Sequence, residues 1–144
     1  AIIGAGGIGF DVAEALSHSS DASQNIATFM REWGVDMSLQ SRGGIEGVTP
    51  QPSPSPRQIT LLQRKASKVG NGLGKTTGWI HRAGLQHKGV EMLAGCEYLR
   101  IDDDGLHIRQ GSEERCIGVD NVVICAGQEP NRQLADGLNK TVHL

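Results

Sequence analysis

The sequence predicts an α/β domain in which a parallel sheet is combined with an antiparallel β-meander. Three observations support this class. Short, largely apolar segments at residues 1–3, 59–62, 90–93 and 122–125 are typical of parallel strands that are covered on both faces. Segments with helical spacing follow the first two of them. Residues 96–119 instead alternate apolar and polar side chains across two turn signals.

The chain opens with a strand, a glycine turn and a helix. Residues 1–3 are β-branched or small and apolar, and a glycine-rich turn follows them directly. In "GIGFDVAEALSH" the helical spacing places four apolar residues on one face: Ile8, Val12, Ala15 and Leu16. The segment is therefore predicted to be an amphipathic helix.

A second helix and a long insert separate this unit from the next strand. The helix is predicted from about Ser23, a good N-cap residue, to Trp33, and Gly34 ends it. Residues 38–58 hold glycine, serine and most of the prolines, which cannot sustain a helix or an interior strand. We therefore predict a surface loop insert over 38–58.

The core resumes after the insert. Residues 59–62 form a buried strand that ends where charge appears at Arg64. A helix is predicted over 75–87, where Gly89 stops it, and a third strand follows at 90–93.

The remaining segments form the meander and the last strands. Turns are predicted at Asp104-Gly105 and Gly111-Ser112 within 96–119. An apolar strand over 122–125 then enters a turn of small residues, and 140–144 alternates like a further strand.

Composition narrows the class of protein. A chain of 144 residues is the size of one domain, and its net charge of −2 gives no reason to expect a nucleic acid or an anionic membrane as partner. Its three cysteines have no metal-binding or disulfide spacing, so we expect a reducing, cytoplasmic setting. Because the chain starts inside an apolar strand and ends on another, we expect 1–144 to be a single domain cut from a larger protein.

The chemistry is carried by the glycine turn. Gly4, Gly6 and Gly9 satisfy G-x-G-x-x-G, with an apolar strand leading in and an amphipathic helix leading out. In this arrangement the first glycine allows the tight turn, the second lets the backbone approach a pyrophosphate, and the third lets helix and strand pack closely. The sequence thus predicts a Rossmann-like, three-layer dinucleotide-binding domain.

The end of the second strand indicates which dinucleotide is bound. An acidic residue there would accept hydrogen bonds from a ribose 2′-hydroxyl, but this strand closes with Gln63, Arg64 and Lys65, and Lys68 lies just beyond. Such cations suit the 2′-phosphate of NADP(H). The alternative is a charged strand end that serves solubility alone.

A second glycine loop, "GNGLGKTTGW" at residues 70–79, resembles a phosphate loop but is misspaced. With Gly74, Lys75 and Thr76 as the closing triplet, the opening glycine should stand at position 69, which is Val69. Lys75 is therefore predicted either to reach a phosphate or to be a solvated lysine at the start of a helix. A P-loop nucleotide-binding protein remains the less favoured alternative.

Four segments together resemble bacterial NADPH-dependent 2,4-dienoyl-CoA reductases: "AIIGAGGIGFDVAEAL", "LLQRKASKVGNGLGKTTGWIHR", "YLRIDDDGLHI" and "VDNVVICAGQEPNR". Members of that family join a flavin barrel and an iron–sulfur cluster to a half built like the two-dinucleotide-domain flavoprotein reductases. The resemblance implies that this chain is the NADPH-binding domain of that half. A related flavoprotein reductase, similar to trimethylamine dehydrogenase, stays open as an alternative.

The resemblance also implies partners and site residues. NADPH would pass a hydride to FAD, and a 4Fe-4S cluster and FMN would carry electrons to an acyl-CoA in fatty acid β-oxidation; FAD, FMN, cluster and acyl-CoA are expected only in the parent protein. The isolated domain is expected to be inactive, with no catalytic or metal-binding residue. The predicted cofactor-binding residues are Gly4, Ala5, Gly6, Gly7, Ile8, Gly9, Arg64, Lys65, Lys68, Lys75, Ala126, Gly127 and Gln128.

Overall fold

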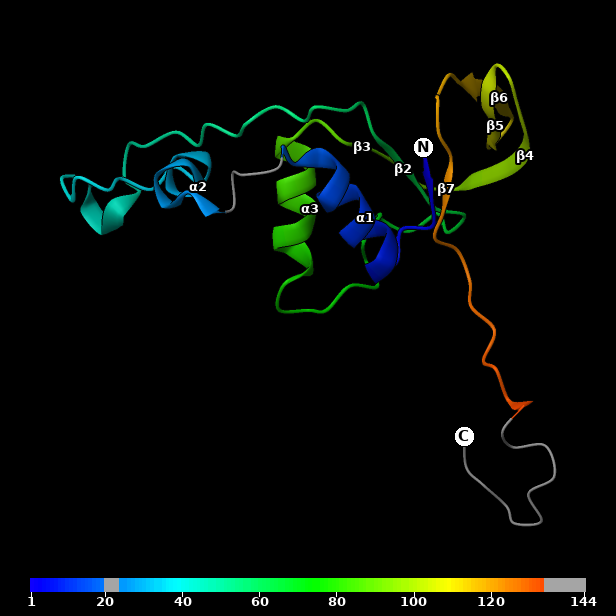
Figure 1. The fold of residues 1–144 in the computed structure, drawn as a ribbon, viewed down its shortest axis with the longest axis horizontal. Coiled ribbons are helices and arrows are strands. Elements are labelled where there is room, and N and C mark those ends of the chain that lie inside the picture. Colours follow the sequence, from blue (N-terminus) through cyan, green and yellow to red (C-terminus); the bar gives the residue numbers. More distant parts are fainter. Residues whose placement is uncertain (20–23, 134–144) are drawn as a thin grey trace, which may run out of the picture.

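The computed structural model describes residues 1–19 and 24–133. A four-stranded parallel sheet forms its centre, in the order β3-β2-β1-β7 (Figure 1). Its strands are β1 (Ile2–Ile3), β2 (Thr60–Leu62), β3 (Glu91–Leu93) and β7 (Val123–Ile124). The predicted parallel strands are thus confirmed, and β1 lies between β2 and β7.

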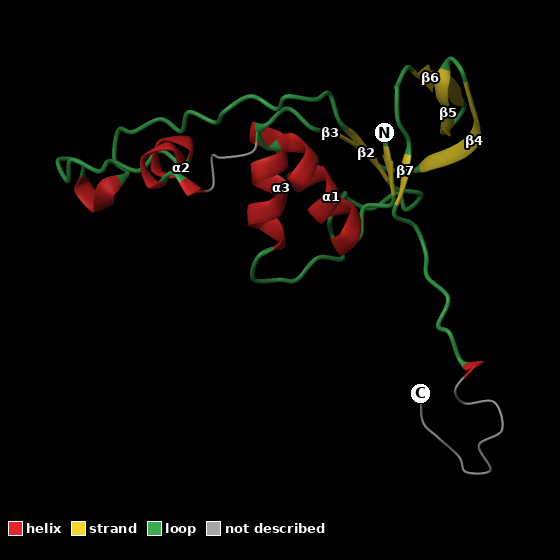
Figure 2. Cartoon of the chain, viewed as in Figure 1, coloured by secondary structure: helices red, strands yellow, loops and turns green. Residues whose placement is uncertain are grey.

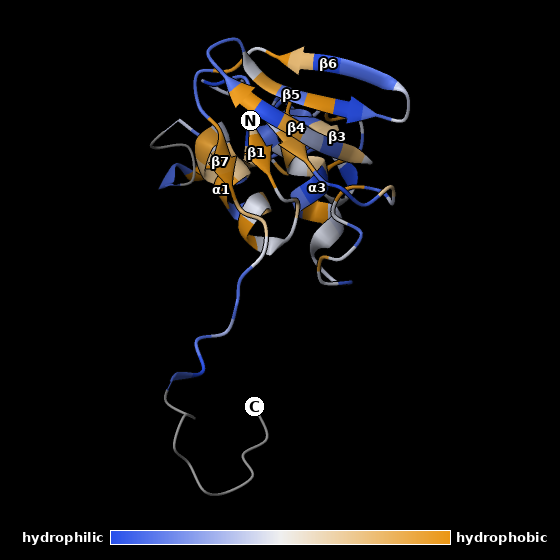
Figure 3. Cartoon of the chain, turned by 90° about the vertical axis from the view of Figure 1, so that its right-hand side faces the viewer, coloured by the Kyte–Doolittle hydropathy of each residue, from blue (hydrophilic) through white to orange (hydrophobic). Residues whose placement is uncertain are grey.

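One face of the sheet is covered by helices and the other by the meander (Figures 1 and 3). The helices are α1 (Gly7–Ser17) and α3 (Gly78–His87). The meander consists of β4 (Cys96–Asp102), β5 (Gly105–Gln110) and β6 (Glu113–Ile117), paired in the antiparallel order β4-β5-β6. The predicted three-layer fold class is confirmed, although the first meander turn is at Asp103-Asp104, one residue earlier than predicted.

Alternation along the central strands divides the core into two clusters. Ile2 and Leu61 belong to the cluster on the helix side, which includes Phe10 of α1. Their neighbours Ile3 and Leu62 belong instead to a cluster on the meander side, with Leu106, Ile108 and Cys96. Both faces of the central strands are therefore buried, which explains why β1 and β2 are almost entirely apolar, with Thr60 as their single polar residue.

The apolar face predicted for α1 differs from the face that is buried at two positions. Ile8 is 52% exposed and Ala15 is also exposed, whereas Phe10 and Ala13 are almost fully buried. The helix is turned so that Gly9 contacts the preceding turn, and the residue one helical turn later, Ala13, consequently faces the sheet.

The second helix, α2 (Ile26–Glu32), starts later than predicted. Its N-cap is Asn25, whose Oδ1 accepts a hydrogen bond from Thr28 N at 3.0 Å, whereas the predicted cap, Ser23, lies outside the described residues. The helix ends before Gly34, as predicted, and Gly34 has a φ of +68°.

The helix α3 also starts later, at Gly78 instead of Lys75. Residues 75–77 form a turn, and the N–H of Gly78 donates to the carbonyl oxygen of Gly74 at 2.8 Å. The predicted stop is confirmed, since Gly89 has a φ of +75° just after the helix.

Between α2 and β2 the chain is irregular, apart from the short 3-10 helix η2 (Arg42–Gly44) (Figure 2). This insert lies beyond the helix layer (Figure 1). A pair of charged side chains attaches it: Lys88 Nζ lies 3.9 Å from Glu32 Oε1, and both side chains are less than one-tenth exposed. Ser53 donates its N–H to Glu32 and accepts from Lys88 through its carbonyl.

The strand predicted at 140–144 lies outside the described residues. Among the described helices, none is both long and apolar enough to cross a bilayer.

Candidate dinucleotide site

The glycine turn lies between β1 and α1, at the carboxyl end of the parallel sheet, where α/β proteins bind ligands. Gly4 has a φ of +109°, and a Cβ there would lie 2.7 Å from the carbonyl oxygen of Cys125. A Cβ on Gly9 would clash with the carbonyl oxygen of Gly4. The fold itself thus requires glycine at these two positions.

Gly6 and Gly7 differ from them, because among residues 1–19 and 24–133 no atom from outside their own stretch of chain lies within 4 Å of a Cβ built on either residue. Gly6 is the N-cap of α1, and its carbonyl accepts from Phe10 N at 3.0 Å. The N–H groups of the first turn have no partner within a helix, and the first turn of α1 carries no acidic side chain. This end of the helix therefore offers open backbone donors and positive potential to an anion.

The turn after β7 lies opposite the glycine turn. Cys125 N donates to Ile3 O at 2.7 Å, which fixes the turn against the first strand, and Gly127 has a φ of +79°. A pocket of about 320 Å³ opens between the two turns, and we call it the glycine-loop pocket. Its lining consists of Gly6, Gly7, Ile8, Ile124, Cys125, Gly127 and Gln128.

The structure thus brings together two groups of predicted residues that are more than 100 positions apart in the sequence. Ala126 belongs to the same exposed turn as Gln128, and its N lies beside Gly4. Ile124 and Cys125 were missed by the sequence analysis. Only their place directly before the predicted turn could have indicated them, and Ile124 is 67% exposed at the pocket.

The predicted cations follow the strand next to β1. Gly4 N donates to Leu62 O at 2.8 Å, so the end of β2 is hydrogen-bonded to the glycine turn. Arg64, Lys65 and Lys68 lie exposed on the loop that follows. The loop that carries these charges therefore begins beside the glycine turn, while the residues lining the glycine-loop pocket come from other segments.

Tyr98 on the meander is a further neighbour that the sequence analysis missed. Burial raises the pKa of its phenol, and the positive charge of Arg64 acts in the opposite direction. Arg64 thus lies within electrostatic range of this ring. The sequence offered no signal for it, because β4 and the loop after β2 come together only in the folded chain.

The second glycine loop does not have the arrangement of a phosphate loop. Gly70 is buried with a φ of +76°, and a Cβ there would lie 2.7 Å from the ring of Phe10. This glycine therefore serves close packing between the loop and α1. Lys75 is exposed in a turn three residues before α3 begins, so it is not in the first helical turn as in a P-loop.

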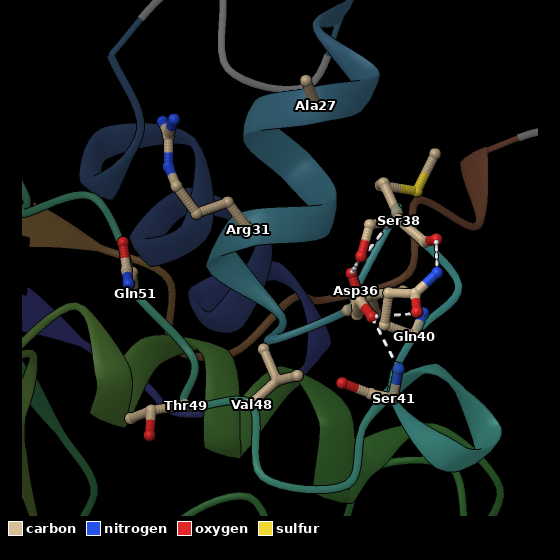
Figure 4. Close-up of a pocket in the computed structure, with 11 residues that line it drawn as sticks. Ala27, Arg31, Asp36, Ser38, Gln40, Ser41, Val48, Thr49 and Gln51 are labelled. Carbon is tan, nitrogen blue, oxygen red and sulfur yellow. Dashed lines mark hydrogen bonds between the residues drawn. The ribbon is translucent and has the colours of Figure 1, made fainter.

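A larger hollow of about 550 Å³ lies between α2 and the segment that follows it (Figure 4). Its polar centre is Asp36, whose carboxylate accepts hydrogen bonds from Ser38 N, Ser38 Oγ, Gln40 N and Ser41 N. The hydroxyl of Ser38 and the N–H groups of Ser41 and Ser38 hold the pKa of Asp36 well below its ordinary range. The carboxylate is therefore used to shape the loop.

Within residues 1–19 and 24–133, no group of three or more His, Cys, Asp or Glu side chains is placed to hold a metal ion. The glycine-loop pocket and the cation-bearing loop after β2 thus form the one candidate site that combines an open helix N-terminus with a neighbouring loop of exposed positive side chains in this part of the chain.

Known proteins share both the sequence pattern and the fold. A FAD-dependent monooxygenase of Beauveria bassiana is 32% identical over 125 residues, which cover 71% of this chain and 26% of that protein. A 2-naphthoyl-CoA reductase in complex with 2-naphthoyl-CoA matches with a TM-score of 0.58 at 18% identity, over 93% of this chain and 15% of that one.

An engineered water-forming NADPH oxidase bound to NADPH matches with a TM-score of 0.50 at 20% identity, over 94% of this chain and 22% of that one. The two structural matches establish the fold, and the chain spans about a quarter or less of each relative. The model of the pyridine nucleotide-disulphide oxidoreductase family matches residues 1–143. The chain therefore belongs to the pyridine nucleotide-disulphide oxidoreductase family.

Proposed function

We propose that the chain is the NADP(H)-binding domain of a flavin-dependent reductase of the 2,4-dienoyl-CoA reductase type. The observation that carries the cofactor choice is the end of β2, where Arg64 and Lys65 stand in place of a carboxylate beside an open glycine turn. A 2′-phosphate needs cations at this position, whereas a 2′-hydroxyl needs an acceptor.

The residues present fit a dinucleotide. Gly6 and Gly7 leave free the space that a side chain would fill, and the N-terminus of α1 offers its N–H groups to a pyrophosphate. Arg64, Lys65 and Lys68 would hold the 2′-phosphate, and the turn from Ala126 to Gln128 would form the facing wall. Bound NADPH supplies a hydride; this chain binds and orients it.

The acyl-CoA part of the proposal is supported by the sequence resemblance and by one relative. The matched 2-naphthoyl-CoA reductase carries an acyl-CoA in its complex and has the same fold over 93% of this chain. FAD, FMN, the iron–sulfur cluster, the unsaturated acyl-CoA and a cytoplasmic location all belong to the proposal for the whole protein.

A second candidate function is the nucleotide-binding domain of a FAD-dependent monooxygenase, favoured by the 32% identity to such an enzyme. Both functions place a dinucleotide on the glycine turn. They are separated by the activity of the whole protein: NADPH oxidation that depends on a dienoyl-CoA favours the reductase, and oxygen incorporation into the product favours the monooxygenase.

The cofactor choice is tested by calorimetric titration of the chain with NADP+, NAD+, FAD and ATP at one ionic strength. The critical variant is the double substitution Arg64→Ala, Lys65→Ala. A charge-assisted hydrogen bond contributes about 1.5–3 kcal/mol, so NADP+ affinity should fall at least about tenfold while NAD+ affinity stays unchanged. A matched control, Arg31→Ala with Arg42→Ala, removes two exposed cations from the α2 and insert region and should leave both affinities unchanged.

Three results would count against the proposal. Equal affinity of the unmodified chain for NADP+ and NAD+ would refute the NADP(H) assignment. Undiminished NADP+ binding by the double variant would show that these cations face solvent alone. Stronger binding of FAD than of either nicotinamide dinucleotide would assign the glycine turn to the flavin.

A further inference from the structure

We propose that Gln63 is a positioning residue that fixes the cation loop, residues 64–68, in the arrangement that selects NADP(H) over NAD(H). The inference rests on the proposed function, because it concerns the 2′-phosphate of the same bound dinucleotide. Its basis is the set of hydrogen bonds that the backbone and the side chain of Gln63 make at the end of β2.

The backbone of Gln63 is held by the neighbouring chain. This residue directly follows β2, and its N–H donates to Leu93 O at 2.9 Å while its carbonyl accepts from Cys96 N at 3.0 Å. Leu93 and Cys96 flank the turn between β3 and β4. The Cα of Gln63 is therefore anchored between the sheet and the meander, and its side chain starts from a fixed point.

The side chain of Gln63 braces the cation loop by hydrogen bonds to its backbone. It is half-buried, and its Nε2 donates to Lys65 O at 2.9 Å and to Ser67 O at 2.6 Å. Lys65 O accepts a second hydrogen bond, from Gly95 N at 3.0 Å. The loop contains no helix or strand, so these bonds hold its backbone in place.

A fixed backbone matters because the cations themselves are long and exposed. Arg64, Lys65 and Lys68 all project from the loop into solvent. Several such side chains reach one phosphate at low entropic cost only when the backbone that carries them is already ordered. The two hydrogen bonds of Gln63 provide that order before the nucleotide arrives.

The residue type at position 63 also bears on the choice between NAD(H) and NADP(H). In NAD-binding relatives of this fold class, a carboxylate near this strand end accepts from the ribose 2′-hydroxyl. A carboxylate has no proton to donate, so it could not bind the carbonyl oxygens of Lys65 and Ser67 as the Gln63 amide does. The braced cation loop and an acidic residue at position 63 therefore exclude each other.

The test compares Gln63→Met, which keeps the length of the side chain and removes its donors, with Gln63→Glu. The matched control is Gln58→Met, an exposed glutamine before the same strand. The readout is the ratio of the NAD+ and NADP+ dissociation constants, measured by calorimetry. Loss of hydrogen bonds of ordinary strength predicts that Gln63→Met lowers NADP+ affinity about three- to tenfold and leaves NAD+ affinity within about twofold.

Gln63→Glu should lower NADP+ affinity more than Gln63→Met does, because it adds a negative charge beside the phosphate, and Gln58→Met should change nothing. If the unmodified chain does not prefer NADP+, the proposed function fails first. If it does prefer NADP+ and Gln63→Met keeps the ratio unchanged, or weakens both nucleotides equally, the role of Gln63 is overturned and the proposed function stands.

If the variants do not fold, a measurement on the unmodified chain tests the role of Gln63 instead. The side-chain amide protons of Gln63, observed by NMR, should shift when NADP+ binds and remain in place when NAD+ binds. Equal shifts with both nucleotides would overturn the inference.

Discussion

Two alanine substitutions in the glycine turn, Gly9→Ala and Gly6→Ala, should have opposite consequences for stability and binding. A Cβ on Gly9 would clash with the carbonyl oxygen and carbon of Gly4, which are backbone atoms and cannot rotate away. A Cβ on Gly6 meets nothing within 4 Å, and the φ of −84° at this residue is open to any amino acid. The two positions therefore separate what the fold requires from what the ligand requires.

The magnitude for Gly9→Ala follows from two opposing contributions. Overpacking a close contact costs about 1–3 kcal/mol, and the rigid backbone partner places this site near the upper value. Alanine regains about 1 kcal/mol of helix propensity over glycine within α1. A net loss of about 2 kcal/mol in the free energy of unfolding corresponds to a fall in Tm of about 4–8 °C for a domain of this size.

Gly6→Ala should cost less stability and more affinity. Alanine is a poorer N-cap than glycine, and this difference lowers the free energy of unfolding by about 1 kcal/mol. The added methyl occupies the open space where the pyrophosphate would approach the backbone, so dinucleotide affinity should fall at least about tenfold. Gly84→Ala lies inside α3, and among the described residues no atom from outside its own stretch of helix lies within 4 Å of the added Cβ, so it is the matched control for the gain in helix propensity.

Thermal unfolding and NADP+ calorimetry on the three variants measure the effects on stability and on dinucleotide affinity separately. An unchanged Tm for Gly9→Ala would refute the close approach of α1 to the glycine turn. A folded Gly6→Ala variant with unchanged affinity would place the pyrophosphate elsewhere.

Two further predictions concern the region around the insert. Asp36→Asn should raise the amide exchange of Ser41 without lowering the global Tm, because an amide offers one acceptor oxygen where the carboxylate uses two. The folded-state pKa of Asp36 lies below its unfolded value. Its stabilisation of this loop is therefore complete above about pH 4 and is lost as the pH falls through the folded pKa. Loss of amide protection in the loop at neutral pH in the unmodified chain would contradict this. Lys88→Met should destabilise the chain by about 1–3 kcal/mol in chemical denaturation, because it leaves the buried Glu32 carboxylate without its cation. Adding Glu32→Gln should restore part of that loss, and a double variant as unstable as Lys88→Met would show that the pair is not coupled.

Local signals in the sequence were sufficient for the class of fold and for the heart of the candidate site. The alternation at residues 96–119, the largely apolar strands and the sequence Gly4-Ala5-Gly6-Gly7-Ile8-Gly9 each act within a few residues, through backbone conformation and side-chain period. Strand, turn, helix and meander were therefore predictable one by one, and each was found close to its expected place.

Only the tertiary structure decided which face of α1 is buried, where the turn after β7 lies, and what Gln63 does. Phe10 replaces Ile8 in the core because Gly9 meets Gly4 across the turn, and Cys125 meets the same turn from a distant part of the chain. The brace of Gln63 on the cation loop depends likewise on β3 and β4 holding its backbone. Such contacts join residues that are far apart in sequence, and their geometry is set by packing and by complete pairing of buried polar groups, which no local pattern encodes.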